Sequence, residues 1–138
     1  MIGVFCVLLF FGIFVLPKLI QSHTATPEQQ VDHVKINMKT LQSMVEIYSH
    51  HWNQKYPQNV DELSKDAHDR QYWKGMTNPL RGGTLKGYSY TDDADLIIMP
   101  GVVTYTLEIR SQHYFIYGYD AQGSRMIEGN KTVVLSNQ

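Results

Sequence analysis

The sequence predicts an α+β fold, with an N-terminal hydrophobic helix and an amphipathic helix packed on a small antiparallel β-sheet. Three features predict it: an uncharged apolar run at the start, one long stretch of helical periodicity, and then only β-rich segments. No crossover helix separates those segments, so neighbouring strands are expected to be antiparallel. We expect an apolar helix over residues 1–21, a linker over 22–26 and a globular domain over 27–138.

The first element is the run MIGVFCVLLFFGIFVLPKLI, which has no charged side chain before Lys18. As a helix it would reach about 30 Å, the thickness of the hydrocarbon core of a bilayer. A cleaved secretory signal is one alternative, but it would begin with basic residues, and only a weak cleavage sequence follows, near Ala25. A buried helix of a soluble protein is the other. We predict a retained membrane-spanning helix that bends or ends at Pro17.

The second element is an amphipathic helix with a clear start. Thr26 suits the N-cap, Pro27 suits the first helical position, and Gln29 can complete a capping box. Apolar side chains then recur at spacings of three and four up to about Gln54, which places them on one helix face. This expected packing face comprises Val34, Met38, Leu41, Val45, Tyr48 and Trp52. Pairing with a second such helix is the alternative, but the stripe lacks the flanking charges of a coiled coil, so we expect it to pack on the sheet.

The remaining elements are short. Pro57 ends the helix, and Asn59 or Asp61 can cap a short turn through residues 60–63. The segment NPLRGG at 78–83 is dense in turn-forming residues and predicts a loop. Four β-rich runs follow, separated by turns such as TDDADLIIMPG: LKGYSYT at 85–91, VVTYTLEI at 102–109, HYFIYGYDAQG at 113–123 and KTVVLS at 131–136.

The sequence contains no motif typical of an enzyme or a metal site. His50 and His51 are adjacent and would point about 100° apart on a helix, which is typical of a solvated helix end. Three carboxylates at 92, 93 and 95 are of the type that calcium prefers, but their order does not match a calcium loop, so we expect a solvated turn. The single cysteine rules out a disulfide within the chain. We expect no catalytic residue, no metal site and no cofactor.

The net charge and the positions of the tyrosines indicate which kinds of binding partner to expect. With 12 basic and 13 acidic side chains, the chain lacks the basic surplus typical of nucleic-acid binding, so no nucleic-acid partner is expected. Tyrosines lie two apart, as Tyr88 with Tyr90 and Tyr117 with Tyr119, or in a strand-like run, as Tyr105. Such pairs are expected to share one side of a sheet and to pack across strands. An aromatic platform for a ligand is the alternative.

Four segments, in this order, resemble type IV pilin-like proteins, and more narrowly the major pseudopilins of type II secretion. They are Pro17 at the end of the apolar run, LQSMVEIYSHHWNQKYP at 41–57, NPLRGG at 78–83 and YGYDAQG at 117–123. The resemblance implies a non-enzymatic structural subunit of a type II secretion pseudopilus or a type IV pilus-like filament. It also implies a single-pass protein of the bacterial inner membrane with a periplasmic or extracellular globular domain. The implied partners are other pilin-like subunits in a homo-oligomeric filament, the inner membrane and the assembly machinery.

In such filaments the apolar helix first spans the membrane and then packs between subunits. The residues expected to do this here are Val4, Phe5, Val7, Leu8, Leu9, Phe10, Ile13, Phe14, Val15 and Pro17. Family members begin with a basic leader that ends in glycine and carry a glutamate near the front of the run, and this sequence shows neither. One hypothesis is that both are encoded upstream of Met1; the other is an anchored pilin-like domain that is neither processed nor polymerised. Many also hold calcium near the C-terminus, but the segment after Asp120 lacks the acidic residues for it, so calcium has weak support. A membrane-anchored extracytoplasmic binding domain that does not polymerise is the alternative function.

Overall fold

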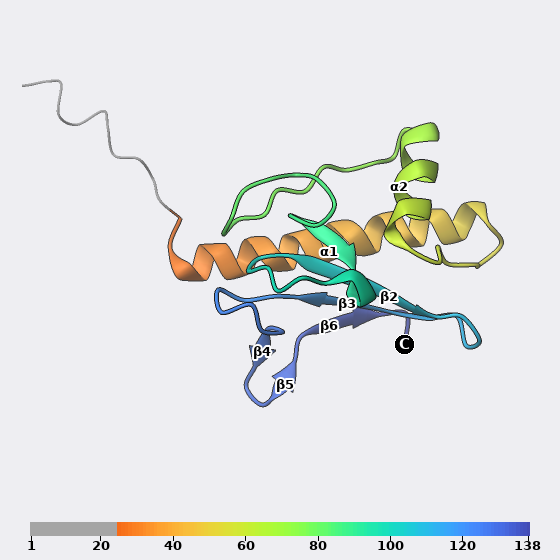
Figure 1. Cartoon of the computed structure of the whole chain (residues 1–138). Coiled ribbons are helices and arrows are strands. Elements are labelled where there is room, and N and C mark those ends of the chain that lie inside the picture. Colours follow the sequence, from red (N-terminus) through yellow and green to blue (C-terminus); the bar gives the residue numbers. More distant parts are fainter. Residues whose placement is uncertain (1–24) are drawn as a thin grey trace, which may run out of the picture.

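The computed structural model describes residues 25–138, which form an α+β fold with a long helix packed on a mixed sheet of four strands (Figure 1). The helices are α1 (Pro27–His51), α2 (Val60–Asp69) and the 3₁₀ helix η2 (Asp93–Asp95). The strands are β1 (Tyr90–Asp92), β2 (Val103–Glu108), β3 (His113–Gly118), β4 (Ile127–Glu128), β5 (Lys131–Thr132) and β6 (Val134–Ser136). The α+β class predicted from the sequence is therefore confirmed.

Helix α1 begins as its sequence predicts. The Thr26 hydroxyl accepts a hydrogen bond from the Gln29 backbone at 3.2 Å, and the Gln29 side chain accepts one from the Thr26 backbone at 2.9 Å. This capping box satisfies two amide groups that the first turn leaves without partners. The helix ends at His51, a little before the expected Gln54, because Asn53 and Gln54 adopt positive φ angles of 52° and 63°.

Helix α2 is longer than the short turn expected at this place. Its N-cap is Asn59, whose side chain accepts a hydrogen bond from the Glu62 backbone at 2.8 Å. A second cap comes from the sheet, because the Asp92 carboxylate accepts the backbone N–H of Val60 at 2.8 Å. Val60 and Leu63 are fully buried, so α2 is fixed both to α1 and to β1.

The strands lie in the order β1-β2-β3-β6, and β4 and β5 form a separate hairpin that projects from the sheet (Figure 1). The pairs β2–β3 and β3–β6 are antiparallel, but β1 runs parallel to β2. The entirely antiparallel sheet expected from the sequence is therefore wrong at this edge. The reason is that η2 and the loop after it return the chain to the start of β2 without a long crossover helix.

The core lies between α1 and the sheet. Along β3 the side chains alternate, so Tyr114 and Ile116 are fully buried against α1 while Phe115 and Tyr117 stack on the other face. The helix approaches so closely that a Cβ on Gly118 would lie 2.7 Å from a methyl carbon of Val34. Residues 27–29 and 31–33 of α1 are exposed, so the first turns of the helix extend beyond the core.

The tyrosine pairs do not share one side of the sheet as expected. Tyr90 is 8% exposed in β1, whereas Tyr88 is 52% exposed because it lies in the turn before that strand. Tyr119 is buried just beyond the end of β3, whereas Tyr117 faces outward and carries the Arg125 guanidinium 3.8 Å above its ring. The exposed sheet face among the described residues is thus partly covered by an arginine.

Candidate functional site

The predicted assembly residues, Val4 to Pro17, lie outside the described residues. Within residues 25–138, no helix combines the length and the apolar character that crossing a bilayer requires. The candidate functional features of the described residues therefore lie on the surface of the globular domain, in its polar clusters and its exposed apolar side chains.

The expected packing face of α1 is buried over five of its six positions. Val34, Met38, Leu41, Val45 and Tyr48 are each at most 6% exposed. Trp52 departs from the expectation, since it is 46% exposed. It is the C-cap residue rather than a helical one, so the periodicity no longer determines its direction. Its ring lies 6.0 Å from that of Tyr48 and 5.5 Å from the Arg70 guanidinium.

One carboxylate joins the end of α1 to α2. Asp66 accepts hydrogen bonds from the Trp52 indole at 3.1 Å, the Arg70 guanidinium at 3.0 Å and the Tyr72 hydroxyl at 2.6 Å. Burial would raise the pKa of the Asp66 carboxyl, but the three hydrogen bonds outweigh burial and hold the pKa below its ordinary value of 3.8. The carboxylate is therefore a structural group at the end of the domain where α1 ends and α2 packs against it.

Replacing Asp66 with alanine is expected to lower the free energy of unfolding by about 2 kcal/mol, because three donors lose a charged acceptor. Since the folded-state pKa lies below the unfolded-state value, the stabilisation is present above that unfolded-state value and is lost as pH falls through the folded-state pKa. Urea unfolding followed by tryptophan fluorescence at neutral and acidic pH measures both effects. Asp69→Ala, at an exposed position of the same helix, is the matched control. Equal stability of the two variants would contradict this role.

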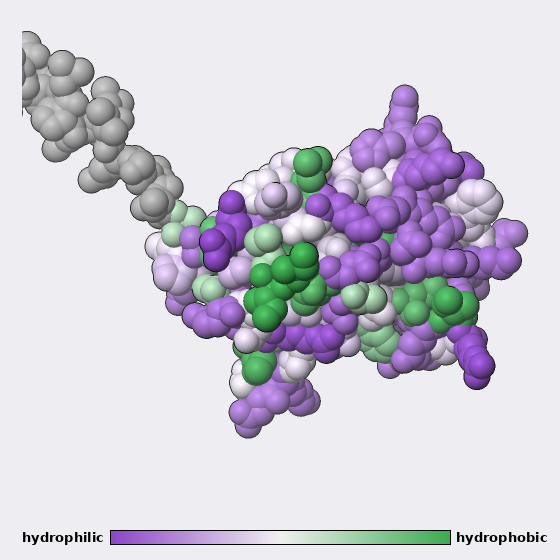
Figure 2. Space-filling view, in the orientation of Figure 1, coloured by the Kyte–Doolittle hydropathy of each residue, from purple (hydrophilic) through white to green (hydrophobic). Residues whose placement is uncertain are grey.

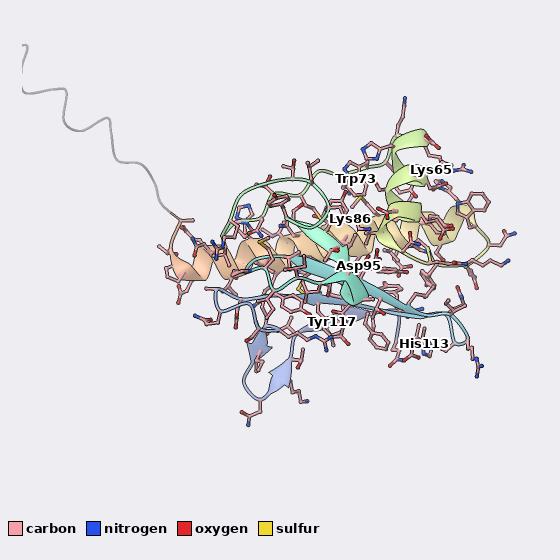
Figure 3. All side chains as sticks on the ribbon, in the orientation of Figure 1. Lys65, Trp73, Lys86, Asp95, His113 and Tyr117 are labelled. Atoms are coloured by element: carbon pink, nitrogen blue, oxygen red, sulfur yellow. The ribbon has the colours of Figure 1, made fainter. Side chains whose placement is uncertain are left out.

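A second cluster surrounds Lys86, in the segment before β1. Its amine lies 2.7 Å from the Asp61 carboxylate, 3.5 Å from that of Asp92 and 3.8 Å from that of Asp95 (Figure 3). The hydrogen bond to Asp61 raises the pKa of the Lys86 amine, and burial raises the pKa of the Asp92 carboxyl. One amine thus faces three carboxylates, and the side chains of Asp61 and Asp95 are 71% and 63% exposed. This surface therefore has more negative than positive charge.

Asp93, the remaining acidic residue of this turn, is neutralised differently. Its carboxylate accepts hydrogen bonds from the Arg125 guanidinium at 3.0 Å, the Thr104 hydroxyl at 2.9 Å and the Tyr119 hydroxyl at 3.1 Å. The acidic turn expected to be solvated is therefore partly built into the fold. Within the part of the chain that the structure describes, no group of three or more His, Cys, Asp or Glu side chains is arranged to hold a metal ion.

Asn78, from the NPLRGG segment, fixes two loops at once. Its side-chain amide donates to the Tyr88 carbonyl at 2.7 Å and to the Pro100 carbonyl at 2.8 Å. Its side-chain oxygen accepts the backbone N–H groups of Leu80 and Arg81 at 2.8 and 3.0 Å. The side chain is 1% exposed, so all four hydrogen bonds are shielded from water. Asn78 therefore determines the position of the connection between β1 and β2.

That connection carries the most exposed aliphatic side chains in residues 25–138, Ile97 at 83% and Ile98 at 75%. Figure 2 shows a hydrophobic group in the middle of the visible face, where Figure 1 places the connection. The sequence predicts only a turn in this segment. Its signal was nonetheless present, because two adjacent isoleucines are unusual in a turn that is otherwise rich in aspartate.

A hollow of about 720 Å³ lies between the end of α1 and the β2–β3 turn and is open to solvent. Several of its polar side chains already bind the protein itself. The Gln112 side chain accepts the Tyr56 N–H and donates to the Ile109 carbonyl, and Asn137 donates to the Gln112 carbonyl. His50 and His51 are exposed at this end of α1, as expected for a solvated helix end. The polar side chains that line the hollow therefore mainly hold neighbouring segments of the chain together, and few of their hydrogen-bonding groups remain for a ligand.

The geometry thus consists of a helix that extends beyond its core at the N-terminal end, an acidic patch, and two rigidly supported isoleucines. None of these three features combines side chains in a catalytic arrangement, and all three lie on the surface of the domain. Comparison with known proteins finds no matching family, no matching curated protein and no matching solved structure.

Proposed function

We propose that this chain is a structural subunit of a filament of the type II secretion pseudopilus or type IV pilus kind, which polymerises through its N-terminal apolar helix. Its globular domain lies on the outer side of the bacterial inner membrane before assembly. The partners are further copies of the chain, the inner membrane and the machinery that assembles the filament. The work of such a subunit is packing rather than catalysis.

One observation carries the proposal. The capped start of α1 follows the apolar run after a short polar segment, and the first turns of α1 extend beyond the core. An amphipathic helix whose first turns extend beyond the sheet can place the apolar segment that precedes it in the sequence away from the globular domain. There it can contact lipid first and neighbouring subunits afterwards. Because lipid is as apolar as a leucine surface, the preference for neighbours must come from close packing, which Gly3 and Gly12 would permit.

Further support comes from what the described surface offers. The charged clusters around Asp66 and Lys86 join elements of the fold, and the large hollow is lined by side chains that already bind one another. The exposed isoleucines and the acidic patch are better suited to contact with another protein surface than to chemistry. A subunit of an assembly needs such surfaces outside its membrane helix.

Deleting residues 1–21 is expected to abolish assembly while leaving the globular domain folded. The full chain, with the family's leader and glutamate restored ahead of Met1, and the deleted chain would be expressed with the assembly machinery of a pseudopilus. Sheared surface fractions would be examined by negative-stain electron microscopy and by sedimentation. The proposal predicts filaments from the full chain and a slowly sedimenting, dispersed protein from the deleted one. Filaments from both chains, or from neither, would contradict it. Tryptophan fluorescence checks that the deleted chain is folded.

A further inference from the structure

Ile97 and Ile98 are presented by a loop that the fold holds in place. The Pro100 carbonyl is bound by the buried Asn78 amide, and the Val102 N–H donates to the Met99 carbonyl at 3.3 Å. Ile98 lies over Gly123, where an added Cβ would come within 2.5 Å of its methyl group. Two large aliphatic side chains are thus kept in water by specific contacts. Exposed apolar surface of this kind is typical of an interaction site.

Negative charge beside the two isoleucines restricts which kinds of partner surface can bind there. Lys86 faces three carboxylates, and Asp61 and Asp95 remain largely exposed, so this edge has surplus negative charge. A bilayer surface with anionic headgroups would repel it. The occupant must therefore offer an apolar hollow with a positively charged rim.

The same chain offers such a hollow on a different surface. A groove of about 100 Å³ between α1 and β6 is lined by Met38, Val133 and Leu135, with lysines at its rim. Lys35 is paired with Glu128, whereas Lys39 is exposed beside the groove. The groove is almost entirely apolar inside, and its volume equals about three times the share of one water molecule in the liquid. None of its residues belongs to the isoleucine loop.

We propose that the Ile97–Ile98 loop of one subunit docks in the groove between α1 and β6 of a second copy of this chain, with Asp95 facing Lys39. The inference rests on the proposed filament function and adds a contact between globular domains to it. Because the loop and the groove are different surfaces, each copy can insert its loop into the groove of one neighbour and accept the loop of another neighbour in its own groove. A heterologous contact of this kind repeats from subunit to subunit and continues as a filament unless it closes into a ring.

Cysteine cross-linking of assembled full-length chains tests the contact. In a Cys6→Ser background, Ile98→Cys combined with Val133→Cys is expected to give a ladder of dimers, trimers and larger species with a short bismaleimide. Ile109→Cys combined with Val133→Cys is the matched control, because Ile109 is also exposed, at 62%, but belongs to the β2–β3 turn. This control is expected to give at least tenfold less ladder. Each variant would be checked for filaments by electron microscopy.

The outcomes separate this inference from the proposed function. Filaments with no more cross-linking at 98/133 than at 109/133 would overturn the docking contact and leave the filament function standing. Absence of filaments from the unsubstituted chain would overturn both. With Cys6 retained and Val133→Cys alone, a cross-linked monomer of altered mobility would show that the chain's own N-terminal segment fills the groove, and would also overturn the contact.

A charge exchange tests the ion pair independently. Asp95→Lys is expected to reduce the 98/133 ladder severalfold, because it places a like charge opposite Lys39. Adding Lys39→Asp to the same chain is expected to restore it. Failure of the double variant to recover, with filaments still present, would overturn the pairing of Asp95 with Lys39.

Discussion

Asn78→Asp is expected to lower the free energy of unfolding by at least about 3 kcal/mol, although the two side chains have nearly the same shape. The amide nitrogen of Asn78 donates to two backbone carbonyls, those of Tyr88 and Pro100. A carboxylate oxygen in the same place cannot donate, so the two carbonyls would lose their partner and would face a negative charge instead. Such an arrangement combines unsatisfied acceptors with an unpaired buried charge.

Urea unfolding followed by tryptophan fluorescence measures this loss. Asn130→Asp is the control, because it makes the same chemical change at an exposed turn between β4 and β5. The deficit of the Asn78 variant is expected to shrink at acidic pH, since a protonated carboxyl can donate one hydrogen bond again. The two variants being equally stable at neutral pH would mean that Asn78 does not hold the loops together.

The second large effect is expected in the N-terminal run. Introducing arginine at both Leu9 and Ile13 is expected to disfavour membrane insertion by about 6 kcal/mol, since arginine near the centre of a spanning helix costs about 3 kcal/mol relative to leucine or isoleucine. This corresponds to roughly a ten-thousandfold change in the insertion equilibrium. The substituted chain should move from the membrane pellet to the supernatant after carbonate extraction.

The control for this prediction adds the same charges outside the apolar run, as Ser22→Arg with Thr24→Arg. This control is expected to remain in the pellet, because flanking residues lie at the level of the polar headgroups. If the chain with arginine at 9 and 13 stays with the membrane as firmly as the control, the run is not a membrane-spanning helix.

The sequence predicted those parts of the fold whose causes are local. The start of α1 follows from Thr26 and Gln29, which lie three residues apart, and the burial of Val34 through Tyr48 follows from helical periodicity. The predicted burial of Trp52 is wrong because Trp52 lies one residue beyond His51, the last residue of the helix. There the positive φ angles of Asn53 and Gln54, rather than periodicity, direct the chain.

The parts that the sequence did not predict depend on contacts between distant residues. Helix α2 is capped partly by Asp92, and the parallel pairing of β1 with β2 depends on the return of the loop that Asn78 holds. The groove between α1 and β6 is lined by both Met38 and Leu135, which lie far apart in the sequence. The isoleucine pair was visible in the sequence, but only the structure shows that the fold leaves it exposed.

The proposed function requires that the apolar run be kept in the finished protein and join one subunit to the next. Intact-mass and N-terminal peptide analysis of the protein recovered from sheared filaments tests this most directly. We expect molecules that retain residues 4–20 and sediment as large assemblies. Mature protein that begins after Ser22 and sediments as a monomer would contradict it.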